Sequence, residues 1–200
     1  MIKGIKEDEF TYNPVKRLNT AIVNTLDKKS ISSAILNTIS FIFYLAAGFC
    51  FAIYDIRIAA GLLLVGSLFS LINIQLKRKK GSSIPADYYL VSVMDRYSDI
   101  FIFMGLIYRY IRNDELIVSL IATLALIGCI LVSYTGLRKE FASKNVTVGF
   151  MRRKERVAII IIGALLNHMV TALYIIAILA NLDALFRIHY IYKVLKNKPA

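Results

Sequence analysis

The sequence has few of the residues that build disulfides, zinc sites and redox centres. Its 200 residues include only two cysteines, Cys50 and Cys129, and two histidines, His168 and His189. No C-x-x-C pair and no cluster of His and Cys occurs, which excludes a disulfide framework and a zinc site of the usual spacing. The cysteines lie in apolar runs and are expected to be small core residues. The histidines lie near the ends of such runs, where interfacial anchoring is expected instead of catalysis.

Charged residues are missing from long stretches of the chain. Hydrophobic residues make up 58% of the sequence, and the mean hydropathy is +0.62. Apolar runs of about twenty residues recur, which is typical of membrane helices and excludes a soluble helical bundle. Lys and Arg outnumber Asp and Glu by 25 to 13. They cluster between the runs, so membrane topology and anionic headgroups explain the excess, and no nucleic acid partner is expected.

The apolar runs predict an all-α membrane fold with six spans in a single domain, 13–200, after a polar tail at 1–12. Asn13-Pro14 opens a stretch with apolar residues at helical spacing, which predicts either an amphipathic interfacial helix or an ordinary helix packed on the protein. The expected spans are 33–54, 58–76, 87–111, 116–135, 157–170 and 171–192, with Asn167-His168 near the last break.

The distribution of basic residues predicts the orientation of these spans. Most Lys and Arg lie near the N-terminus, in 77–80, in a polar segment at 138–156 and at the C-terminal end. The turns on the opposite side hold only Arg57 and Arg112, with Arg109 close by. The positive-inside rule then predicts a multi-pass protein of the cell membrane with both termini in the cytoplasm.

The third predicted span carries three charges within Asp95–Asp99. Ionised groups in hydrocarbon cost from about 2.5 kcal/mol each upward, so they pair with each other, meet an ion or water, or face a polar cavity. Asp95 and Asp99 are one helical turn apart and share a face, where like charges repel. We therefore expect a positive group opposite them, or a proton on one of them.

The order of these features resembles the CDP-alcohol phosphotransferase family. The sequence D-R-Y-S-D at Asp95–Asp99 is similar to the end of the family signature D-x-x-D-G-x-x-A-R … G-x-x-x-D-x-x-x-D. Three later stretches, 133–140, 149–156 and 181–187, resemble further family motifs. The resemblance implies a dimer with a cytoplasm-facing polar cavity and with membrane lipids as partners. It also implies the transfer of a phosphorylated lipid group from a CDP-lipid to an alcohol. The alcohol can itself be phosphorylated.

The signature is degenerate in this chain. With Asp95 as its last acid, an ungapped alignment puts Ser70, Asn73 and Val91 at the three other acid positions, and Ile74 and Asp87 at the two glycines. Carboxylates would hold the divalent ions of the family reaction, and Mg²⁺ requires oxygen ligands. Val91 has none, and the oxygens of Ser70 and Asn73 are neutral. We therefore expect no intact metal site and no cofactor, or Mg or Mn if the chain is active.

The resemblance also assigns roles to the residues that remain. Asp95 would be the general base. The residues that would bind phosphate or nucleotide are Arg78, Lys77, Asn73, Arg138 and Arg153. Lys77 replaces a small Ala, so its ammonium could be a counter-ion for Asp95, or it could extend to lipid headgroups. The arginines could equally be surface charges that set the topology.

Three functions remain open from the sequence. The first is an inactive or weakly active paralogue, a pseudoenzyme that binds a lipid phosphate or serves as a partner subunit. The second is an active transferase that moves a phosphatidyl-type group from a CDP-lipid to an alcohol. The third is an unrelated membrane transporter or scaffold with the same number of helices. A homodimer and a heterodimer with an intact family member are both compatible with the first.

Overall fold

The computed structural model describes residues 33–80, 85–137 and 149–196, without the side chains of 78–80, 85–88, 136, 137 and 195. This part of the chain is helical, as predicted, and holds six helices: α2 (Ser33–Ile53), α3 (Ile56–Lys80), α4 (Pro85–Arg112), α5 (Leu116–Leu137), α6 (Arg153–Leu165) and α7 (Met169–Lys196). The predicted polar tail and interfacial helix lie outside the described residues.

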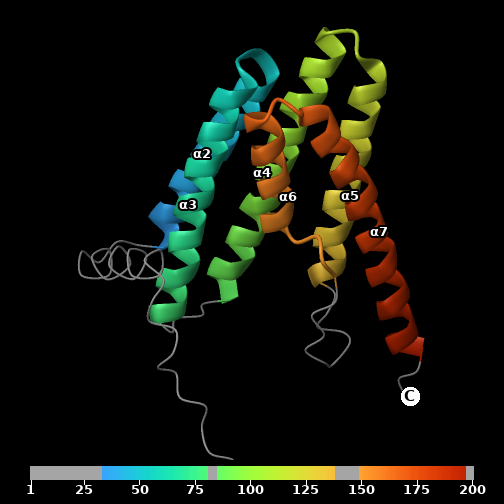
Figure 1. Cartoon of the computed structure of the whole chain (residues 1–200). Helices are drawn as coiled ribbons and strands as arrows, with labels where there is room; N and C mark the ends of the chain where they lie inside the picture. The colour runs from blue at the N-terminus through green and yellow to red at the C-terminus, as the bar shows by residue number, and fades with distance from the viewer. Residues whose placement is uncertain (1–32, 81–84, 138–148, 197–200) are drawn as a thin grey trace, which may run out of the picture.

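The six helices are neighbours in a closed ring. α2 packs against α3 and α4, α5 packs between α4 and α7, and α6 lies between α7 and α3. Figure 1 shows α2 and α3 on one side, α5 and α7 on the other, and α6 in the middle of the view with α4. In this ring α4 and α6, which are distant in sequence, face each other across the interior.

Four helices, α2, α3, α5 and α7, are long and apolar enough to cross a membrane. They correspond to four of the six predicted spans. α4 has 28 residues but carries the charged Asp95–Asp99 stretch. α6 has only 13 residues, or about 20 Å of helix, against about 30 Å for a hydrocarbon core. Membrane crossing by all six helices therefore stays a prediction.

The structure corrects the boundaries around the fifth predicted span. The sequence predicts a polar segment up to Arg156 and a span over 157–170, whereas α6 begins at Arg153 and ends at Leu165. The prediction used apolar residues alone, so it left the charged first turn of α6 in a loop. The break follows at 166–168, where Asn167 has a φ of 59°, and α7 begins at Met169 instead of 171.

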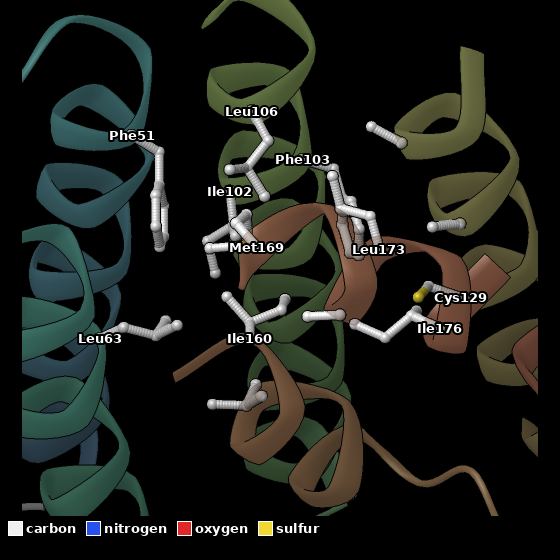
Figure 2. Packing of buried hydrophobic residues seen from close by; sticks show 14 of the residues in the cluster. Phe51, Leu63, Ile102, Phe103, Leu106, Cys129, Ile160, Met169, Leu173 and Ile176 are labelled. Carbon is white, nitrogen blue, oxygen red and sulfur yellow. The ribbon is translucent and has the colours of Figure 1, made fainter. Parts of the chain in front are cut away.

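Apolar side chains from all six helices fill the interior (Figure 2). The labelled members of this core are Phe51, Leu63, Ile102, Phe103, Leu106, Cys129, Ile160, Met169, Leu173 and Ile176. Cys50 is partly buried against the same core, and neither cysteine forms a disulfide. The prediction that both cysteines are core residues is therefore confirmed.

α2 and α4 cross in close contact at two glycines. A Cβ on Gly48 would lie 2.7 Å from the carbonyl oxygen of Phe101, and a Cβ on Gly105 would overlap the carbonyl oxygen of Gly48. Only glycine lets the two backbones approach this closely. The crossing fixes α4 against α2, and with it the acidic stretch that precedes Gly105 on the same helix.

Candidate functional site

Four charged side chains meet between α4 and α6. Nη1 of Arg153 lies 2.7 Å from Oδ1 of Asp95, and its Nε lies 3.1 Å from Oδ1 of Asp99. Nη2 of Arg156 lies 2.7 Å from Oδ2 of Asp99. The predicted cation opposite the acids is confirmed, and two arginines of α6 supply it. We call these four residues the α4–α6 cluster.

The α4–α6 cluster is electrically neutral and partly exposed at one end. The exposed fraction is 35% for the side chain of Asp95 but 9% for Asp99 and 3% for Arg156. Two carboxylates facing two guanidinium groups give each buried ion a counter-ion, which a low-dielectric interior requires. Burial alone would lower the pKa of Arg153, but the negative charges of Asp99 and Asp95 outweigh it and raise that pKa.

Groups around the cluster hold the two arginines in place. The Cζ atom of Arg153 lies 4.5 Å from the ring centroid of Tyr44 on α2, a cation–π contact. Nη1 of Arg156 donates to the backbone carbonyl of Met151 at 3.1 Å. Nη2 of Arg153 has no hydrogen-bond partner among the described residues. Within the described part of the chain, Arg153 thus retains one N–H donor without a partner.

A cavity of about 310 Å³ adjoins the cluster between α2, α3, α4 and α6. Its polar lining consists of Asp95, Arg153, Lys154, the hydroxyls of Ser67 and Ser70, and Tyr44. The remaining lining is aliphatic: Leu71, Ile74, Val157, Ala158 and Ile161. Cationic groups and an apolar wall therefore line the same cavity.

The other acid positions of the signature hold no metal site among the described residues. Asn73 is 3% exposed, and its Oδ1 accepts a hydrogen bond from the hydroxyl of Ser33 on α2. The side chain of Val91 has no oxygen that could bind a metal ion, and the carboxylate of Asp95 forms an ion pair with Arg153. The described part of the chain contains no group of three or more His, Cys, Asp or Glu placed to hold a metal ion. These residues do not fit the divalent ions that the family resemblance implies.

Several predicted site residues remain untested. Arg138 lies outside the described residues, and only the backbone is described at Arg78 and Asp87. Lys77 is partly buried on α3 and makes contacts there. Its role as a counter-ion for Asp95, and the phosphate contacts assigned to it and to Arg78, stay predictions.

A second buried ion pair fixes the chain immediately before α6. Asp183 on α7 is fully buried and accepts hydrogen bonds from the backbone N–H groups of Phe150 at 3.1 Å and Met151 at 3.2 Å. It also pairs with Nη2 of Arg187 at 2.8 Å. Gly149, at a φ of 106°, packs against that guanidinium, where a Cβ would clash. We call Asp183 and Arg187 the α7 pair.

Sequence reasoning missed both Arg156 and Asp183. Arg156 stood in the expected polar segment, although Arg153 and Arg156 are three residues apart and share a face in any helix that includes them. Asp183 was included only as part of a family-like stretch. Its spacing of four residues from Arg187 was the available signal.

The relatives of this chain identify its family. No protein-family model matches the sequence. The chain is 30% identical over 177 residues to archaetidylinositol phosphate synthase of Pyrococcus horikoshii, and the alignment covers 88% of this chain and 91% of that protein. The chain belongs to the CDP-alcohol phosphotransferase family. An uncharacterized protein of Aquifex aeolicus is 27% identical over 88% of this chain and 90% of its own length.

Crystal structures of a Mycobacterium tuberculosis phosphatidylinositol phosphate synthase have the same fold. The structure with CDP-DAG bound has a TM-score of 0.80 and 18% identity, over 92% of this chain and all of that chain. The complex with manganese and citrate has a TM-score of 0.74 and 20% identity, over 87% and 88% of the two chains. Family membership and four apolar helices make this a multi-pass membrane protein. The family membership rules out the third function left open by the sequence, an unrelated transporter or scaffold.

Proposed function

We propose that this chain is an inactive or weakly active member of the CDP-alcohol phosphotransferase family, which binds a lipid phosphate or serves as a partner subunit. The proposal rests on the residues that occupy the four acid positions of the signature. Asp95, which remains, is ion-paired to Arg153, and Ser70, Asn73 and Val91 hold the other three positions.

The chemistry of the family explains why this loss matters. Transfer from a CDP-lipid requires attack on a phosphorus of the pyrophosphate, and divalent ions held by carboxylates take up the charge that develops there. A general base alone does not replace this electrophilic assistance. Asp95 would face the incoming alcohol without the other signature carboxylates to hold the ions, so turnover should be absent or very slow.

The cavity supports a lipid phosphate as the ligand. Arg153 and Lys154 place two positive groups on its wall, and an unused N–H of Arg153 can donate to a phosphate oxygen. The aliphatic part of the lining, which includes Ile74 and Ile161, suits a hydrocarbon segment. A molecule with a phosphate and an apolar chain matches both properties.

An active transferase is the second candidate. The similarity to the Pyrococcus synthase, which extends over 88% of this chain, favours it. Such an enzyme would use Mg²⁺ or Mn²⁺, a CDP-lipid and an alcohol such as a phosphorylated polyol.

We also propose the membrane arrangement that the basic segments imply. Both termini would lie in the cytoplasm, with Arg109 and Arg112, in the last turn of α4, on the opposite side. The protein would act as a homodimer, or as a heterodimer with an intact family member. Reaction of cysteines introduced at the termini with a membrane-impermeant reagent, in intact cells and in inverted vesicles, tests the orientation.

Release of CMP separates the two candidate functions. Purified protein in detergent is incubated with a CDP-lipid, a panel of alcohols and Mg²⁺ or Mn²⁺, beside the Pyrococcus synthase as a positive control. We expect no CMP above the level of heat-denatured protein. Metal-dependent CMP release that disappears in Asp95→Asn would overturn the proposal and establish an active transferase.

A further inference from the structure

We propose that the cavity beside Asp95 selects a lipid phosphate that carries no nucleotide, and that Ile74 is the residue that excludes a CDP-lipid. Ile74 stands at the first glycine position of the signature, and its side chain lines the cavity. The inference rests on the proposed function and deepens it, because it names the class of lipid that the cavity takes.

Two helix faces form most of the cavity wall. Residues three or four apart share one face of a helix, and the lining residues of α3 are spaced in this way: Ser67, Ser70, Leu71 and Ile74. α6 contributes a face that begins with Arg153 and Lys154 and ends with Ile161. The two helices run in opposite directions, since α3 descends in Figure 1 toward Lys80 and α6 rises from Arg153. Ile74, the last lining residue of α3, therefore lies at the cationic end of the cavity.

The position of Ile74 decides what a bound phosphate can carry. Arg153 and Lys154 are the cationic groups of the lining, so a phosphate binds at their end of the cavity. The hydrocarbon chain of the lipid then extends along the apolar residues of α6 toward Ile161. A nucleotide attached to the same phosphate would continue past the cationic end. There the branched side chain of Ile74 fills space that a glycine would leave open.

The volume of the cavity supports the same conclusion. It measures about 310 Å³, whereas ligand pockets for drug-sized molecules range over about 300–1,000 Å³. A CDP-lipid adds a base, a ribose and a second phosphate to the lipid phosphate. A cavity at the lower end of the range suits a phosphate with a segment of chain and leaves no room for these additional groups.

The charges of the lining match a single phosphate. Arg153 and Lys154 are positive and Asp95 is negative, so the ionised side chains of the lining leave one net positive charge. This charge balances a lipid phosphodiester or a singly ionised phosphomonoester. The pyrophosphate of a CDP-lipid carries two negative charges, which divalent ions balance in phosphoryl transfer. The described residues form no group that could hold such ions, so the second charge would remain uncompensated.

Competition between two lipids tests the inference in the unaltered protein. Phosphatidic acid and CDP-diacylglycerol with the same acyl chains are used to displace a fluorescent lysophosphatidic acid from purified protein in detergent with EDTA. We expect phosphatidic acid to bind at least about tenfold more tightly than CDP-diacylglycerol. Equal affinities, or a preference for CDP-diacylglycerol, would overturn the inference. This measurement does not require any variant to fold.

Ile74→Ala tests whether this residue causes the preference. Shortening the side chain at the cationic end should reduce the preference for phosphatidic acid to about threefold or less. Ile161→Ala is the matched control, because it removes the same atoms from the part of the cavity where the chain common to both lipids lies. It should change both affinities alike and leave their ratio as it was. An unchanged ratio in Ile74→Ala, or an equal fall in Ile161→Ala, would overturn the assignment of Ile74.

The inference and the proposed function fail in different assays. Equal binding of both lipids without CMP release would overturn the inference alone. No binding of the fluorescent lipid would overturn the lipid phosphate as the ligand, and the inference with it. Glycerol phosphate, which has the phosphate but no chain, should compete at least about tenfold more weakly than phosphatidic acid. Equal competition would make the ligand a soluble phosphate ester instead of a lipid.

Discussion

The α4–α6 cluster and the α7 pair are built from the same two residue types but differ in what surrounds them. In the α7 pair, Asp183 is fully buried, and its two oxygens accept from two backbone N–H groups and from Arg187. In the α4–α6 cluster, Asp95 is 35% exposed beside a cavity, and Arg153 keeps an unused donor.

This difference separates a structural ion pair from one that can take a ligand. A buried carboxylate whose oxygens are all bonded has no capacity left for another molecule, and breaking it leaves uncompensated charge. A partly exposed pair beside a cavity contributes little to stability but can exchange partners. We therefore expect substitutions in the α7 pair to affect stability, and substitutions at Asp95 to affect binding.

The largest expected effect is that of Asp183→Ala. The substitution leaves Arg187 buried without its partner and removes the acceptor for Phe150 and Met151, so the free energy of unfolding should fall by about 4 kcal/mol. Denaturant-induced unfolding in detergent, followed by circular dichroism, measures it. Glu155→Gln is the control, since Glu155 is an exposed acid in the first turn of α6. A loss below about 1 kcal/mol would show that the pair contributes no more than a surface contact.

Asp99→Ala tests the buried end of the α4–α6 cluster. Asp99 is the carboxylate shared by Arg153 and Arg156, so its removal should cost about 3 kcal/mol in the same unfolding experiment. Combining it with Arg156→Leu should recover part of this loss, because Arg156 then no longer stays buried without a partner. If the double variant is simply the sum of the two single losses, the two side chains are not coupled.

Gly149→Ala tests how the α7 pair fixes the start of α6. Its φ of 106° is unfavourable for alanine, and the added Cβ would press on the guanidinium of Arg187. The expected loss is about 2 kcal/mol. Gly61→Ala on α3 is the matched control, because a Cβ there meets no atom within 4 Å. Equal effects at the two glycines would mean that Gly149 has no special role.

The sequence was sufficient to predict the helices and the face of α4 on which Asp95 and Asp99 lie. Charge-free runs and turn residues predicted most helix ends within a few residues. The four-residue spacing of Asp95 and Asp99 predicted either a positive group opposite them or a proton on one of them. The identity of that cation required the fold. Arg153 is more than fifty residues away in sequence, and the closed ring alone brings α6 opposite α4.

The same reasoning explains why Arg156 and Asp183 were missed. Charges at the end of an apolar run indicate a membrane boundary unless a partner is known to face them. Apart from Arg187, which lies four residues from Asp183, the partners here are Asp99 on another helix and two backbone N–H groups in a connecting segment. Such pairings between distant segments have no local pattern in the sequence.

Asp95→Asn has the smallest expected effect on stability and the most informative effect on binding. Because the side chain is partly exposed and Arg153 keeps its contact with Asp99, the free energy of unfolding should change by less than about 1 kcal/mol. The loss of one negative charge beside the cavity should tighten binding of a phosphate-bearing amphiphile severalfold in the presence of EDTA, because Arg153 is then less neutralised. Titration of a fluorescent lysophosphatidic acid against the unaltered protein and Asp95→Asn measures this, with the uncharged monoacylglycerol as the matched ligand. If Asp95→Asn weakens binding of the phosphate ligand, or tightens binding of both ligands equally, then the exposed end of the α4–α6 cluster has only a structural role, as the α7 pair has.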